Sequence, residues 1–152
     1  MNEFSALEQI ERGLYLLVIK LKESHRISVG RLPETTFRAG IYLYVGRAER
    51  GLKGRLKRHL RKQKKLFWHV DYLLQKAEID EIWIKRDSLN ECLTVHDIKN
   101  TLKSSLYPLK KFGSSDCACP SHLFYLPENK THLNSLRKKL SLERIDIHGN
   151  QI

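Results

Sequence analysis

Several features are scarce or missing in this chain, and each absence excludes a class of protein. Three cysteines occur, an odd number that argues against a closed disulfide framework and favours a reducing cytosol. No apolar run is long enough to span a membrane, and residues 1–12 lack the basic-then-apolar layout of a signal peptide. We therefore expect a cytoplasmic protein with no membrane partner and a short helix over residues 1–12.

Acidic residues are scarce beside basic ones, so the chain carries a formal net charge of +11. Ten Lys or Arg residues fall between Arg47 and Lys65, where Glu49 is the only acid. Such a block indicates a polyanionic partner, with nucleic acid ahead of an anionic membrane surface. A solvated helix face is the competing explanation. The length of 152 residues and the hydrophobic content of 41% fit one soluble domain, residues 1–152, with its own core.

Periodicity along the chain predicts an α+β fold, in which a small, mainly antiparallel central β-sheet is flanked by helices. Residues 13–21 and 41–45 have the apolar, β-branched character of strands. Because side chains alternate along a strand, Tyr42 and Tyr44 share one face of the second strand. Further strands are predicted at 81–85 and 122–126, with a short extra strand within the polar segment 22–40. Helices are predicted at 66–77, at 89–103 and after Pro127. One more helix should begin between residues 51 and 54 and end near residue 65.

The helix predicted from 51–54 to about 65 combines an apolar stripe with polar residues beside it. Leu52, Leu56 and Leu60 recur every four residues and form a stripe that faces the core. Arg55 and His59 are also four residues apart, so they lie together next to that stripe.

Short motifs follow one another in a fixed order along the chain. They are GLY at 13–15, GIYLYVG at 40–46, GLKGR at 51–55, WHVDYLL at 68–74, NECL at 90–93 and FGSSDCACPSHL at 112–123. In this order they resemble the GIY-YIG endonuclease superfamily and, within it, the Uri-like prokaryotic branch. The resemblance implies a GIY-YIG-like core over about residues 12–126, with a helical tail over about 127–152.

Two copies of the first motif compete for the same role. The site of that superfamily needs two tyrosines on adjacent strands. Tyr42 and Tyr44 share one strand, so residues 40–42 match the first motif by coincidence and are not its functional copy. Tyr15, on a separate strand, is therefore the partner of Tyr44.

The resemblance implies a metal-dependent endonuclease that hydrolyses DNA phosphodiester bonds. Tyr15 would be the general base, Tyr44 would bind the phosphate or the attacking water, and Arg55 would clamp the phosphate. His59 would share in proton transfer, and Glu91 would bind Mg²⁺ or Mn²⁺. Because a free tyrosine has a pKa near 10, Tyr15 would need the metal, Arg55 or nearby lysines to help it lose its proton at neutral pH, and the basic block offers such a field. Further contacts to the nucleic acid are expected from Arg47, Lys53, Arg58 and Lys62.

Other interpretations of these residues stay open. Ser88 and Glu91 fit a capping box, which would give Glu91 a purely structural role. The chain also suits a non-catalytic basic nucleic-acid-binding module, because a basic helix serves binding and catalysis alike. His69 and Asp71 would face different sides of a helix, which argues against a joint metal site and favours structural hydrogen bonds.

The cysteines suggest a second metal hypothesis. Cys117, Cys119 and His122, together with Cys92, have the residue types of a structural zinc site. The C-x-C spacing is unusual, and His96 is another option for the fourth ligand. From the sequence we favour the competing interpretation, in which these are small buried thiols beside a loop histidine.

Overall fold

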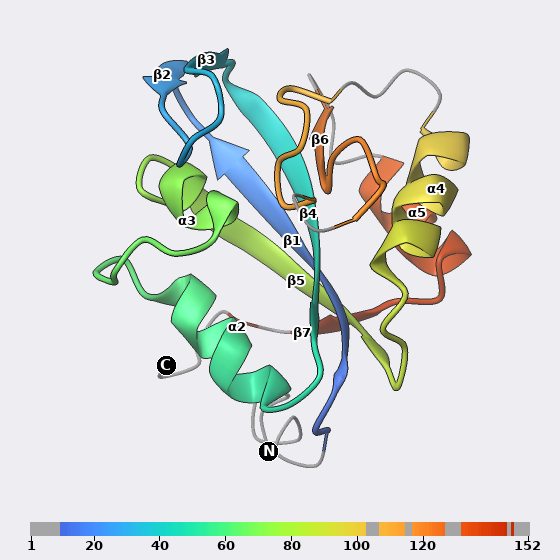
Figure 1. The fold of residues 1–152 in the computed structure, drawn as a ribbon. Helices are drawn as coiled ribbons and strands as arrows, with labels where there is room; N and C mark the ends of the chain where they lie inside the picture. Colours follow the sequence, from blue (N-terminus) through green and yellow to red (C-terminus); the bar gives the residue numbers. More distant parts are fainter. Residues whose placement is uncertain (1–9, 103–106, 115–116, 127–131, 146, 148–152) are drawn as a thin grey trace.

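The centre of the molecule is a five-stranded sheet in which every neighbouring pair of strands is antiparallel. The computed structural model describes residues 10–102, 107–114, 117–126, 132–145 and 147. Within these ranges the strand order is β6-β4-β1-β5-β7 (Figure 1). The strands are β1 (Gly13–Leu21), β4 (Gly40–Ala48), β5 (Glu78–Arg86), β6 (Leu123–Leu126) and β7 (Glu143–Ile145). The predicted α+β fold with a mainly antiparallel sheet is confirmed.

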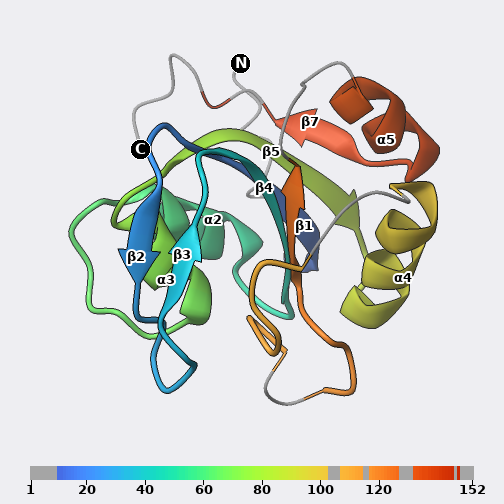
Figure 2. The ribbon, with the colours of Figure 1, turned by 90° about the horizontal axis from the view of Figure 1, so that it is seen from above.

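Helices cover both faces of this sheet (Figure 2). On one face lie α2 (Leu52–Leu60) and α3 (His69–Leu74), and on the other lie α4 (Glu91–Thr101) and α5 (Leu133–Lys139). A small second sheet pairs β2 (His25–Ile27) with β3 (Thr35–Phe37), both from the segment predicted as a loop with one extra strand. None of the helices in the described ranges is long and apolar enough to cross a membrane.

The position of β1 explains its composition. This strand lies between β4 and β5, and Lys20 is its one exposed residue. A strand with neighbours on both edges and helices on both faces needs apolar side chains in both directions. Odd-numbered residues from Tyr15 to Leu21 pack toward α2 and α3, whereas even-numbered residues from Leu14 to Val18 pack toward α4 and α5. Tyr15 therefore lies on the face covered by α2 and α3.

The chain leaves helix α2 earlier than predicted. The helix ends at Leu60 rather than near residue 65. Nζ of Lys64 donates to the carbonyl oxygens of Arg58 at 3.1 Å and His59 at 2.7 Å. A lysine that satisfies the last carbonyls stabilises a helix end. This early end frees the chain to turn toward α3.

Helix α4 begins differently from the prediction. Its N-cap is Asn90, whose side-chain oxygen accepts a hydrogen bond from the backbone N–H of Leu93 at 2.9 Å. The predicted capping box of Ser88 and Glu91 is therefore wrong. Glu91 is the first residue of the helix, and capping does not account for its side chain.

Two further differences concern the ends of the chain. The segment predicted as a helical tail also contains β7, which pairs with β5 at the edge of the central sheet. The helix predicted near the N-terminus falls mostly on residues 1–9, which lie outside the described residues.

Candidate functional site

A cleft of about 760 Å³ opens where the start of β1 pairs with the end of β4. Residues from two strands and three helices line it. Four of the lining residues have a predicted catalytic or metal-binding role: Tyr15, Tyr44, Arg55 and Glu91. The other lining residues are Gly46, Arg47, Glu49, Arg50, Phe67, Trp68, His69 and Gly113. The fold thus brings four predicted residues, distant in sequence, to one cavity.

Tyr15 lies at the back of the cleft, with 2% of its surface exposed. Its partner across the β1–β4 pair is Gly46, and a Cβ atom on that glycine would lie 2.4 Å from Cζ of Tyr15. Position 46 must therefore be glycine for the tyrosine ring to occupy its place. The hydroxyl of Tyr15 makes a 2.7 Å hydrogen bond with Nε2 of His59.

The electrostatics of this pair differ from the sequence expectation. Burial raises the pKa of Tyr15 to about 12, and the opposing effect of Arg55 is smaller. Burial, with Lys64 nearby, lowers the pKa of His59 to about 3. Arg55, a member of the basic block, lowers the pKa of Tyr15 as expected, but desolvation by burial outweighs this effect. Both side chains are neutral at pH 7.

Tyr44 and Tyr42 have different surroundings although they share a face of β4. Burial raises the pKa of Tyr44, which lines the cleft and meets the ring of His59 edge-on. Tyr42 lies outside the cleft lining, and its hydroxyl donates to the carbonyl oxygen of Arg38 at 2.5 Å. Its ring packs against Tyr125. Tyr42 is therefore a packing residue.

Arg55 is held in the cleft from two sides. Its Nη1 donates to the carbonyl oxygen of Arg47 at 3.0 Å, and its guanidinium carbon lies 4.3 Å from the ring centroid of Trp68. Arg58 contacts the same ring, at 4.4 Å. The two guanidinium groups thus share one indole ring, which fixes the direction of Arg55.

Asp71 organises the segment around Trp68. Its carboxylate is fully buried and accepts two hydrogen bonds from Arg58, at 3.0 and 2.9 Å. It also accepts one from the backbone N–H of Phe67 and one from that of Trp68, both at 2.8 Å. Asp71 therefore makes structural hydrogen bonds, as predicted from the sequence.

His69 points to the other side of the same helix. Its Nδ1 accepts a hydrogen bond from the backbone N–H of Gly113 at 2.8 Å, and its ring lines the cleft. Burial lowers its pKa, so the imidazole is neutral at pH 7 and its proton lies on Nε2. The motif from 112 to 123 is thereby tied to the cleft, a link that the sequence did not reveal.

The basic block divides into two groups with different surroundings. Arg47, Arg50 and Arg55 line the cleft. Arg58 is paired with Asp71, and Nζ of Lys62 donates to two carbonyl oxygens at the end of α3. Of the predicted phosphate contacts Arg47, Lys53, Arg58 and Lys62, the cleft lining includes Arg47. Arg50 was missed, although its place in the turn after β4 beside Arg47 was a usable signal.

Glu91 reaches the cleft from the first turn of α4. Its Oε1 lies 3.0 Å from Nε of Arg47, and its Oε2 lies 3.1 Å from Nδ1 of His122. A carboxylate in a cleft is the hard donor that Mg²⁺ or Mn²⁺ uses, together with water and phosphate oxygens. The Arg47 side chain is 45% exposed, so it has room to leave Oε1 for such an ion. The donor present fits the expected cation.

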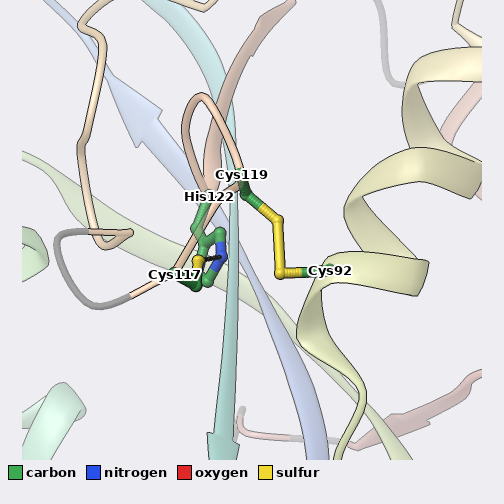
Figure 3. A group of neighbouring side chains, drawn as sticks. All are labelled: Cys92, Cys117, Cys119 and His122. Carbon is green, nitrogen blue, oxygen red and sulfur yellow. Dashed lines mark hydrogen bonds between the residues drawn. A yellow bond between two sulfur atoms is a disulfide. The ribbon is translucent and has the colours of Figure 1, made fainter.

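Sulfur and nitrogen ligands form a group (Figure 3) that includes Cys92, the residue after Glu91 in α4, and His122, whose Nδ1 contacts Glu91. Ligand atoms of Cys92, Cys117, Cys119 and His122 all lie within 4.8 Å of one another, an arrangement that could hold a metal ion. Cys92 and Cys119 are joined as a disulfide, and Cys117 is free. The four residues of the second metal hypothesis are therefore brought together, and His96 lies outside the group.

Comparison with known proteins identifies one extended match. The family model described as "Domain of unknown function DUF123" matches residues 14–144. This range includes the residues of the cleft and of the cysteine–histidine group. Neither a curated protein nor a solved structure gives a significant match.

Proposed function

Because the chain belongs to DUF123, a family described without an activity, we propose its function from its cleft: a metal-dependent endonuclease that hydrolyses DNA phosphodiester bonds. One observation carries the proposal. Two tyrosines, an arginine and a glutamate that the GIY-YIG resemblance names converge on one cleft, although they come from four separate elements. A binding module has no need for a buried tyrosine and a carboxylate in the same cleft.

The walls of the cleft support a nucleic-acid substrate. Arg47, Arg50 and Arg55 supply positive charge for phosphates. Phe67 also lines the cleft, with 74% of its surface exposed. An exposed aromatic ring beside basic residues suits the stacking of a nucleobase, so Phe67 is the proposed platform for one.

Arg55 and Tyr44 bind the scissile phosphate in this proposal. The planar guanidinium of Arg55 presents two N–H groups to two phosphate oxygens, and Trp68 keeps it from turning away. Tyr44 is neutral and offers its hydroxyl proton to a phosphate oxygen. Both groups act on negative charge that grows as the phosphate is attacked.

Tyr15 accepts a proton from the attacking water. With a pKa of about 12, roughly one molecule in 10⁵ carries the tyrosinate at pH 7 before substrate binds. Glu91 is one of the charges that raise this pKa. A divalent cation bound to Glu91 would neutralise phosphate charge and replace this negative charge with a positive one, which favours the tyrosinate. The hydrogen bond to His59 fixes the position of the phenolic oxygen.

Cleavage of labelled DNA tests the proposal. Single-stranded, duplex, flap and branched substrates are incubated with Mg²⁺ or Mn²⁺ and with wild type, Tyr15→Phe or Glu91→Gln. We expect Tyr15→Phe to lower the rate about 10²- to 10⁴-fold, the range for loss of a general base, and Glu91→Gln to lower it as well, because the variant loses the carboxylate that would bind the cation. Tyr42→Phe is the matched control, because it removes a buried hydroxyl from the same sheet face outside the cleft.

The outcomes separate catalysis from binding. DNA binding, followed by fluorescence anisotropy, should be retained in the Tyr15→Phe variant. Equal cleavage by wild type, Tyr15→Phe and Glu91→Gln would assign the activity to a contaminant. Salt-dependent DNA binding without cleavage of any substrate would favour the non-catalytic binding module instead.

A further inference from the structure

We propose that Cys92, Cys117, Cys119 and His122 bind one Zn²⁺ ion, and that the zinc-bound imidazole of His122 holds the Glu91 carboxylate in position. The zinc site stands independently of the proposed nuclease activity. The positioning role rests on that proposed function, because it gives a purpose to the orientation of Glu91. Neither part follows from the family match.

The ligand types and their spacing fit zinc. Four ligand atoms lie within 4.8 Å of one another. In a tetrahedral site with Zn–S bonds of about 2.3 Å, neighbouring ligands lie roughly 3.8 Å apart, so small side-chain adjustments suffice. Three thiolates and one imidazole form a closed set of the kind used in structural zinc sites. Soft sulfur ligands disfavour Mg²⁺, which prefers oxygen.

The ligands come from two segments whose backbones are fixed. Cys92 is in the first turn of α4, and the other three lie in the loop before β6 (Figure 3). The N–H of His122 donates to the carbonyl oxygen of Phe112 at 2.8 Å, and its own carbonyl oxygen accepts from the N–H of Val45 at 2.9 Å. A metal here would join helix α4 to the edge of the sheet.

The ring of His122 points its two nitrogens at different partners. Nε2 lies 3.4 Å from Sγ of Cys117, whereas Nδ1 lies 3.1 Å from Oε2 of Glu91. This Nδ1 is buried and has no well-aligned hydrogen bond. A histidine that binds a metal through one nitrogen normally donates the N–H of the other to a carboxylate, a backbone carbonyl or a water molecule. Zinc on Nε2 therefore places the proton on Nδ1, where a small rotation gives it Glu91 as acceptor.

The metal site and the cleft share a boundary. A second cavity, of about 220 Å³, is lined by Arg47 and Glu91 together with Cys92, Cys117 and His122. Arg47 and Glu91 also line the main cleft. If Arg47 leaves Oε1 for substrate phosphate, the bond from His122 to Oε2 still holds the carboxylate toward the cleft.

The disulfide in the structure is the competing state of the same group. Zinc binds thiolates, so a bond between Cys92 and Cys119 and a zinc ion on all four ligands exclude each other. The disulfide accounts for two of the four side chains. It leaves unexplained why Cys117 and His122 converge on the same point, whereas zinc accounts for all four.

Metal analysis tests the zinc site directly. The full chain is purified under reducing conditions without added metal or chelator, and its zinc content and free thiols are measured. We expect about one zinc per chain, a closed structural set, in wild type. His122→Ala and Cys117→Ser each remove a direct ligand and should lower zinc affinity by more than the roughly 10- to 100-fold typical of losing an outer partner, while His96→Ala, on α4 outside the group, retains zinc.

A second measurement covers the case in which those variants fail to fold. Replacing zinc with Co²⁺ in the wild-type chain should give the visible absorption of a tetrahedral cobalt–thiolate site. Wild-type protein that holds no zinc, gives no such spectrum and shows a single free thiol would overturn the zinc site in favour of the disulfide.

The positioning role has its own readout. In an NMR spectrum of histidine ring nitrogens, the Nδ1 proton of His122 should be protected from exchange with water. We expect Glu91→Gln to weaken this protection with zinc content unchanged, whereas Glu49→Gln, in the same cleft, leaves it intact. An unchanged signal in the Glu91→Gln protein refutes the positioning role and leaves the zinc site standing.

A four-cysteine variant connects the inference with activity. His122→Cys can keep the metal through sulfur but has no imidazole for Glu91. We expect zinc to be retained, KM for DNA to be unchanged and kcat to fall about 10- to 100-fold, the range for loss of an outer contact to a metal ligand. Full kcat with zinc retained would contradict the positioning role. Because zinc content and the NMR signal need no cleavage, they remain interpretable if the nuclease proposal fails.

Discussion

Removing Arg58 should destabilise the protein strongly, because it leaves Asp71 as a buried and unpaired carboxylate. The Asp71 side chain is 0% exposed, and Arg58 supplies two of its four hydrogen bonds. Breaking one side of a buried ion pair costs about 3–5 kcal/mol. Since the Arg58 side chain retains 20% exposure, we expect Arg58→Met to cost about 3 kcal/mol, at the lower end of that range.

Urea unfolding followed by tryptophan fluorescence measures this cost, and a second variant isolates its cause. The double variant Arg58→Met with Asp71→Asn removes the buried charge but keeps a side-chain oxygen for the N–H groups of Phe67 and Trp68. It should recover about 2 kcal/mol relative to Arg58→Met alone. Both variants lose the contact of Arg58 with Trp68, so that contact cannot explain the difference.

The pH dependence provides a second check with a definite sign. Burial raises the pKa of Asp71, but Arg58 and the backbone N–H groups outweigh it, so the pKa lies below 3.8. In wild type the resulting stability is present above pH 3.8 and is lost as pH falls through the lowered pKa. In Arg58→Met the burial effect dominates, so stability should increase as the medium is acidified from pH 7. A single variant that loses less than about 1 kcal/mol, or a double variant as unstable as the single one, refutes the reasoning.

Three further predictions concern the cleft. Because the pKa of Tyr15 is about 12 without metal and a cation on Glu91 would lower it, kcat/KM for cleavage should rise about tenfold per pH unit below that lowered pKa; a rate that falls as pH rises from roughly 6 to 9 contradicts a tyrosine base. Gly46→Ala should cost about 1–3 kcal/mol in thermal or urea unfolding because its Cβ overlaps the Tyr15 ring, whereas Gly54→Ala, which meets nothing within 4 Å, should be neutral or slightly stabilising. Arg50→Ala should lower the salt dependence of DNA binding by about one phosphate contact, and Lys62→Ala, whose ammonium binds carbonyl oxygens of the protein, should leave that dependence unchanged even if stability falls.

The strands of the sheet, and the side of the sheet on which each tyrosine lies, could be predicted because both depend on a local rule. Side chains alternate along a strand, so residues 13–21 and 41–45 were sufficient to place Tyr15 and Tyr44 on defined faces. Their meeting in one cleft required the pairing of the two strands, which the resemblance implied and the sequence pattern did not. Glu91 also lines the cleft, and the capping box offered as the alternative for it is absent.

The rest depended on contacts that charge and periodicity do not encode. A run of lysines and arginines gives the net charge of a segment, but it does not tell which side chains turn inward. Arg58, Lys62 and Lys64 bind a buried carboxylate or backbone carbonyls, and this is visible only once α2 and α3 are packed together. The net rise in the pKa of Tyr15 could not be predicted for the same reason, because burial is a property of the fold.

The order in which the strands are made has a consequence for the newly synthesised chain. The two edge strands of the central sheet, β6 and β7, are its last two in sequence. Until the ribosome has translated residues 123–145, β4 and β5 each have an edge without its final neighbour. Such edges are templates for pairing with another chain. A translational pause after α4 would therefore leave the nascent protein most exposed to aggregation and most in need of a chaperone.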